Sequence, residues 1–234
     1  MLKLEHFLCN PVFRENCWLF HEGGTGVLLD PGFTNDSEFA PFEDFVRKEN
    51  LRLEAIIITH GHYDHIYGVS RCLDTFGKVP VYMHPDDVEL IGMAEDMAKP
   101  YGGCPALAFD TVDIADGEVL NLVGRQWTVI STPGHSKGSV CYYCPSEKLL
   151  FSGDTLFAGT IGRTDLHGGS YDQLIVSIMD KLMGLDGDTT VICGHGRPTT
   201  ISDERTHNPF LQPWGEKEQD GIDWEEDGIE LDNG

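Results

Sequence analysis

The stretch Thr59-His60-Gly61-His62-Tyr63-Asp64-His65 places three histidines and one aspartate within six positions. It directly follows Ala55-Ile56-Ile57-Ile58, a continuous apolar run that is typical of a strand buried on both faces of a sheet. Neither a helix face nor a strand face needs imidazole for packing, so amphipathic periodicity does not account for the cluster. Imidazole nitrogen and carboxylate oxygen are common ligands of zinc and iron. We therefore predict that His60, His62, Asp64 and His65 bind metal.

Three further candidate ligands occur later in the chain. They are His135 in Thr132-Pro-Gly-His, Asp154 in Ser152-Gly-Asp-Thr and His195 in Cys193-Gly-His-Gly. Each follows a short apolar run and has a small or turn-forming residue beside it, as in loops that present side chains at the end of a sheet. One histidine near a strand end is more often a surface or hydrogen-bonded side chain than a ligand. Together with the first cluster, however, the three predict a site for two metal ions.

The order of these motifs resembles that of the metallo-β-lactamase superfamily. The resemblance extends from about Cys17 to Asn208 and is greatest to the short bacterial branch similar to hydroxyacylglutathione hydrolase, or glyoxalase II. It implies an α/β fold of the αββα sandwich type, in which helices cover the outer faces of two facing mixed β-sheets. Without the resemblance, the residue pattern predicts only a mixture of α and β structure.

The resemblance also implies a role for each ligand. One ion would be held by His60, His62 and His135. The other would be held by Asp64, His65 and His195, and Asp154 would bridge the two ions. Two dications that lie close together need a shared anionic ligand to offset their repulsion. Asp64 would be catalytic, because it can orient the bridging hydroxide or take its proton. The expected cofactors are two divalent ions, zinc in the first place and iron or manganese as alternatives.

For the reaction, the resemblance implies a thioester hydrolase that cleaves a hydroxyacyl-glutathione-type substrate with a bridging hydroxide. Lactone hydrolases share all seven ligands and are one alternative. A persulfide dioxygenase with a single iron is another, because that family also contains the sequence Gly162-Arg163-Thr164-Asp165. β-Lactam hydrolysis is not expected, since the antibiotic-cleaving members lack the bridging aspartate. A non-enzymatic scaffold is disfavoured because no member of the ligand set is missing.

Substrate recognition is expected to involve Arg163. This residue stands where the resembling family has a lysine that contacts glutathione. The alternative is a structural salt bridge between Arg163 and Asp165. A counterpart of the helical C-terminal domain that binds glutathione in glyoxalase II is not expected, because only 39 residues, many of them acidic, follow His195 in this sequence.

Composition restricts the partners that the protein can bind. The 234 residues carry a formal net charge of −23, which disfavours nucleic acid and anionic membranes. No apolar run approaches 18 residues and no secretory signal is visible, and the seven cysteines are scattered. We therefore expect a cytoplasmic protein with reduced thiols that acts on a small thioester or ester, and the oligomeric state stays open.

The chain is expected to divide into a hydrolase domain, residues 1–213, and an acidic tail, residues 214–234. Residues 216–234 contain nine acidic residues and one lysine, so the tail has little to bury and is expected to be mobile. Docking of Trp224 on a partner is the alternative. Within the domain, helices are expected at 39–49, 64–76 and 171–183, and residues 92–108 are expected to form a loop and helix near the mouth of the site.

Overall fold

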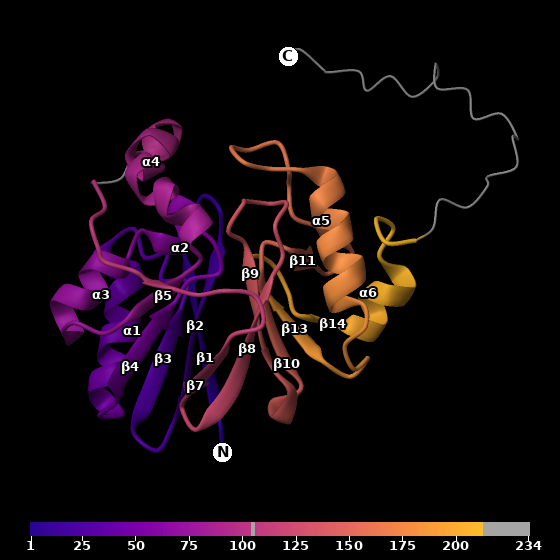
Figure 1. Ribbon diagram of the computed structural model, residues 1–234. Coiled ribbons are helices and arrows are strands. Elements are labelled where there is room, and N and C mark those ends of the chain that lie inside the picture. The colour runs from indigo at the N-terminus through magenta and orange to yellow at the C-terminus, as the bar shows by residue number, and fades with distance from the viewer. Residues whose placement is uncertain (104–105, 213–234) are drawn as a thin grey trace, which may run out of the picture.

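The computed structural model describes residues 1–103 and 106–212. Two six-stranded sheets face each other, and helices cover their outer faces, which confirms the αββα sandwich (Figure 1). The first sheet contains, in spatial order, β1 (Lys3–Cys9), β2 (Glu15–Glu22), β3 (Thr25–Leu29), β4 (Arg52–Ile57), β5 (Val81–Met83) and β6 (Val112–Asp113). The second contains β14 (Thr199–Thr200), β13 (Thr190–Cys193), β10 (Leu149–Gly153), β9 (Val140–Cys144), β8 (Arg125–Ser131) and β7 (Val119–Leu122). A small hairpin pairs β11 (Leu156–Phe157) with β12 (Thr160–Ile161).

The helices divide between the two outer faces of the sandwich. The first half contributes α1 (Asp36–Lys48), α2 (Tyr63–Ile66), α3 (Val69–Phe76) and α4 (Val88–Ala98). The second half contributes α5 (Tyr171–Ser177) and α6 (Ile201–His207), and α5 continues into a π-helical turn, Ile178–Leu182. Figure 1 shows α1 and α3 outside the first sheet, and α5 and α6 outside the second.

Strand β4 explains why the run before the histidine cluster is apolar at every position. Ala55 and Ile57 point inward and pack with residues of the second sheet such as Trp127. Ile56 points outward and packs with side chains that include Phe42 of α1. Because side chains alternate along a strand, residues 55–57 of β4 are buried on both faces, and apolar side chains are favoured at each of them. The predicted buried strand is confirmed.

The predicted helix over 64–76 is wrong as a single element. The structure has two helices, α2 and α3, separated at Tyr67 and Gly68. The backbone N–H of Gly68 donates to the carbonyl of Pro31 at 2.7 Å, and a Cβ at this position would lie 2.7 Å from the same oxygen. This tertiary hydrogen bond interrupts the helix, and a side chain at position 68 would prevent it.

The other local predictions are close to the structure. Helix α1 begins at Asp36, earlier than expected, because the side chain of Asn35 accepts a hydrogen bond from the N–H of Glu38. Residues 92–108 include the second half of α4. Cys141 and Cys144 are buried on opposite faces of β9 and pack in two different hydrophobic clusters. The acidic stretch 214–234, with Trp224, lies outside the described residues.

No helix within residues 1–103 and 106–212 has the length and apolar character needed to cross a membrane.

Candidate metal centre

The seven predicted ligands meet at one end of the sandwich. His60 and His62 follow β4, and Asp64 and His65 lie on α2. The remaining three, His135, Asp154 and His195, follow strands β8, β10 and β13 of the second sheet. Strands β10 and β13 are parallel neighbours, so the loops that carry Asp154 and His195 emerge side by side. The structure therefore brings together all seven residues that the sequence motifs singled out.

Three histidines form the first group of donor atoms. Nδ1 of His62 lies 2.8 Å from Nε2 of His135, and this Nε2 lies 3.2 Å from Nε2 of His60. All three side chains are buried. One nitrogen of each imidazole thus points to a common centre, as required of a three-histidine metal site.

Asp64, His65 and His195 form the second group. Nε2 of His65 lies 3.2 Å from Nε2 of His195. Oδ2 of Asp64 lies 3.5 Å from Nε2 of His195 and 3.9 Å from Nε2 of His65. These three atoms can hold a second ion beside the first.

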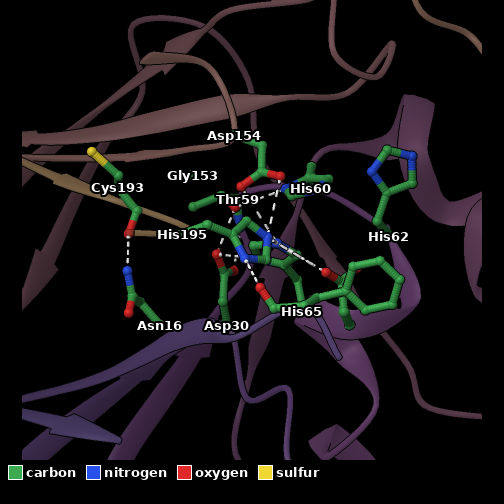
Figure 2. A network of polar contacts seen from close by, with 12 residues as sticks. Asn16, Asp30, Thr59, His60, His62, His65, Gly153, Asp154, Cys193 and His195 are labelled. Atoms are coloured by element: carbon green, nitrogen blue, oxygen red, sulfur yellow. Dashed lines mark hydrogen bonds and ion pairs between the residues drawn. The ribbon is translucent and has the colours of Figure 1, made fainter. Parts of the chain in front are cut away.

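The carboxylate of Asp154 lies between the two groups (Figure 2). Oδ2 is 3.5 Å from Nε2 of His135 and 3.4 Å from Nε2 of His195, and Oδ1 is 3.5 Å from Nε2 of His65. Oδ1 is buried without a hydrogen-bond partner among the described residues. A buried carboxylate oxygen that no donor satisfies fits a cation ligand, so the donor set suits a bridged pair of metal ions.

The second nitrogens of three rings fix the orientation of their imidazoles. Nδ1 of His135 donates to the backbone carbonyl of Arg163 at 2.7 Å, and Nδ1 of His195 donates to the carbonyl of Phe13 at 2.9 Å. Nδ1 of His65 donates to the carboxylate of Asp30 at 3.0 Å. With Nδ1 hydrogen-bonded to these acceptors, each ring directs its Nε2 at the centre of the site.

Burial and charge set the protonation of these groups. Burial lowers the pKa of His62 to about 3 and that of His60 well below its ordinary value, so both rings are neutral and can act as ligands. Burial alone would also lower the pKa of His195, but Asp154 and Asp64 raise it to about 11. The carboxylates therefore strongly favour positive charge at the centre of the site.

A cavity of about 570 Å³ opens over the ligands. Its floor includes His62, Asp64, Asp154 and His195. The walls are mainly apolar or aromatic and include Phe13, Tyr63, Met97, Pro100, Tyr101, Phe157 and Leu166. The ring of Phe13 meets Tyr101 edge to face at 4.8 Å between centroids and Tyr63 at 5.7 Å. The cavity can thus hold an apolar portion of a substrate above the donor atoms.

Arg163 lines this cavity, but its guanidinium is paired. Nε and Nη2 donate to the two carboxylate oxygens of Asp165 at 2.7 and 2.8 Å. The hydrogen bond from Arg163 lowers the pKa of Asp165 to about 2. The salt bridge that the sequence offered as an alternative is therefore present, and it occupies the Nε–Nη2 edge of the guanidinium, one of two edges that can bind a carboxylate.

Sequence motifs did not identify several residues that support the ligands. Asp30 accepts hydrogen bonds from Thr59 and His65 in the interior. The carboxamide of Asn16 donates to the carbonyl of Cys193 (Figure 2) and to that of Gly196, and these two residues lie on either side of His195. The only sequence sign of Asp30 is its place at the end of β3, the neighbour of the strand that leads to the histidines.

Comparison with known proteins identifies the family. The model of the metallo-beta-lactamase superfamily matches residues 10–195, so the chain belongs to this superfamily of metal-dependent hydrolases. Hydroxyacylglutathione hydrolase GloC of Haemophilus influenzae is 33% identical over 202 residues, which cover 85% of this chain and 93% of GloC.

Two solved structures resemble the whole sandwich. The B3 metallo-beta-lactamase BLEG-1 superposes with a TM-score of 0.82 and 34% identity, over 90% of this chain and all of that one. TTHA1623 in a di-iron-bound form gives a TM-score of 0.77 and 34% identity, over 88% of this chain and all of that one.

Proposed function

We propose that this protein is a two-metal hydrolase that cleaves a thioester. The observation that carries the proposal is the position of Asp154 between two complete groups of three donors, with its Oδ1 buried and without a hydrogen-bond partner among the described residues. Zinc is the expected metal, and iron or manganese are alternatives because first-row ions compete for sites of nitrogen and oxygen donors. The di-iron form of TTHA1623 supports iron as an alternative.

The metal ligands and Asp64 would have different roles in hydrolysis. When bound, the two ions would lower the pKa of a water held between them and polarise the carbonyl of the substrate. Asp64 can orient that water or take its proton, because its carboxylate lines the floor of the cavity. Burial tends to raise the pKa of Asp64, but His65 and His195 outweigh burial and lower it, so Asp64 is ionised and its oxygens are free to accept a hydrogen bond from that water.

The walls of the cavity exclude water from the substrate and hold it in place. Phe13, Tyr63 and Tyr101 contact one another above the second group of donors. A hydroxyacyl-glutathione-type thioester is the first substrate to test, since the similarity to GloC extends over most of both chains. The leaving thiolate needs little protonation, so a separate general acid is not required.

We also infer a cytoplasmic location. The six cysteines in the described part of the chain are buried and free, which suits a reducing compartment.

A persulfide dioxygenase with a single iron is the second candidate. It is motivated by the sequence Gly162–Asp165 and would need two histidines and Asp154 as ligands. The complete second group of Asp64, His65 and His195 favours two ions instead.

The deciding experiment pairs metal analysis with substrate assays on the purified full-length protein. We expect about two ions per chain and hydrolysis of a hydroxyacylglutathione thioester. A neutral thioester, a lactone and a β-lactam serve as comparison substrates, the last because of the likeness to BLEG-1. One iron per chain with oxygen uptake on glutathione persulfide would overturn the proposal in favour of the dioxygenase.

A further inference from the structure

Asp87 is a buried carboxylate beside the metal centre that is not itself a predicted ligand. It lies between β5 and α4, and 1% of its surface is exposed. Three donors reach it. The N–H of Gly61 and the hydroxyl of Ser136 donate to Oδ2 at 2.8 and 2.6 Å, and the N–H of Gly138 donates to Oδ1 at 2.6 Å.

These donors belong to the two loops that carry the first group of histidines. Gly61 separates His60 from His62, and Ser136 directly follows His135. The first loop leaves β4 of one sheet, and the second leaves β8 of the other. Asp87 therefore joins, through one carboxylate, two loops that come from opposite sheets of the sandwich.

Close packing fixes this arrangement. A Cβ at Gly61 would lie 2.7 Å from the carbonyl oxygen of Asp87, and a Cβ at Gly138 would lie 2.8 Å from its Cβ and Cγ. Both positions need glycine so that the backbone N–H groups can approach the carboxylate. The separation of the two loops thus depends on contacts made by Asp87.

The second group of donors has different supports. Asp30 accepts from His65, and Asn16 donates to the carbonyls of Cys193 and Gly196 on either side of His195. In the described part of the chain, the hydrogen bonds of the Asp87 carboxylate extend only to the loops of the first group. Asp30 also accepts from Thr59, the residue before His60, so it contacts both groups, whereas Asp87 contacts only the first.

We propose that Asp87 is a positioning residue for one metal ion, the ion that His60, His62 and His135 would hold. By fixing the distance between two loops, its carboxylate keeps Nε2 of His60, Nδ1 of His62 and Nε2 of His135 directed at one point. This inference rests on the proposed two-metal function and adds that the first group has a supporting carboxylate whose hydrogen bonds, in the described part of the chain, do not extend to the loops of the second group. Mutation of a residue that orients a metal ligand through a hydrogen bond typically lowers the metal affinity about tenfold to hundredfold.

The test is metal binding by the full-length Asp87→Asn variant. The asparagine has nearly the same shape, but its NH₂ group must face at least one of the three donors, so a hydrogen bond is lost. After removal of metal with a chelator, Zn²⁺ is titrated in competition with a chromophoric chelator, and Co²⁺ spectra report the ligand geometry. We expect one of the two dissociation constants to rise about tenfold to hundredfold and the other to change less than about threefold.

Matched variants make the result specific. Asp86→Asn changes the neighbouring exposed aspartate, which has no bond to the ligand loops, and should bind both ions normally. Asn16→Leu should weaken binding of the other ion, giving the reciprocal pattern.

Two further variants test the assignment to the first group. In a His195→Ala background, where only the first group is complete, Asp87→Asn should still weaken binding of the remaining ion. If Asp87→Asn does not fold, Ser136→Ala removes a single hydrogen bond to Asp87 and should raise the same dissociation constant to a smaller extent.

The outcomes separate this inference from the proposed function. Wild-type affinity for both ions in Asp87→Asn, or an equal loss of both, would overturn the positioning role. A wild-type protein that binds two ions and hydrolyses no thioester would overturn the proposed reaction and leave the role of Asp87 intact. A wild-type protein that binds fewer than two ions would overturn both.

Discussion

Nδ1 of His65 donates a 3.0 Å hydrogen bond to Oδ2 of Asp30, and both side chains are fully buried. The same carboxylate accepts from the N–H and the hydroxyl of Thr59 at 2.7 and 2.6 Å. Asp30 has a φ of +47°, in the left-handed region that non-glycine residues seldom adopt. Asp30 thus fixes the ring of His65 and the residue before His60 at once, and its strained backbone is consistent with a functional role.

The Asp30→Ala variant should be less stable even without metal. Three buried donors would lose their acceptor, which should lower the free energy of unfolding by about 3 kcal/mol. Urea denaturation of the metal-free protein measures this loss separately from metal binding. Asp74→Ala, at an exposed position of α3, should change the stability by less than about 0.5 kcal/mol. Equal stability of the two variants would contradict the supporting role of Asp30.

The Asp154→Ala variant should lose most of its metal and nearly all hydrolysis. Two dications without a shared anion repel each other, and both groups of donors face this carboxylate. The loss of turnover should exceed the roughly hundredfold effect of residues that only orient ligands. Metal analysis and steady-state kinetics measure both quantities. Full metal occupancy with normal turnover would exclude the bridging role.

Short sequence motifs identified the candidate ligands, whereas their supports depend on tertiary contacts. His60, His62, Asp64 and His65 lie so close together that their residue types alone indicate a metal site. Asn16, in contrast, donates to the backbone carbonyl of Cys193, 177 positions away. Every residue has a backbone carbonyl, so the sequence does not indicate which one Asn16 contacts.

Helix boundaries and charge pairing can also be predicted from the sequence only where the contacts that decide them are local. The break at Gly68 depends on a carbonyl presented by Pro31, which no local pattern reveals. The pairing of Arg163 with Asp165 could be anticipated because the two residues are only two positions apart. Whether a substrate competes with Asp165 for the guanidinium depends on the ligand and not on the local sequence.

Variants of Arg163 and Asp165 should have opposite effects on an anionic glutathione thioester. The side chain of Arg163 is 57% exposed and its guanidinium is already paired, so its contribution to binding is reduced by solvent screening. Arg163→Ala should therefore raise KM by about three- to tenfold, below the range of a buried charge-assisted contact. Asp165→Asn frees the guanidinium and should lower KM.

A neutral thioester provides the control for both variants. Its KM should change little, because a remote ion contact adds binding that only a charged substrate can use. If Arg163→Ala raised KM equally for the charged and the neutral substrate, Arg163 would be a structural partner of Asp165 and not a substrate contact. Steady-state kinetics on the two substrates distinguishes these results.

Tyr101 should control the size of the apolar group that the cavity accepts. Its ring packs edge to face on Phe13 and is half exposed, so it closes the cavity beside the second group of donors without contacting a predicted ligand in the described structure. Tyr101→Ala should raise KM for a thioester with an aromatic acyl group by about tenfold, since an aromatic contact contributes about 1 kcal/mol beyond the area that it buries. Tyr101→Phe keeps the ring and should behave like the wild type, and both variants should bind two ions. A loss of metal in Tyr101→Ala, or an equal rise in KM for a small acyl thioester, would show that the ring supports the site as a whole and does not select the acyl group.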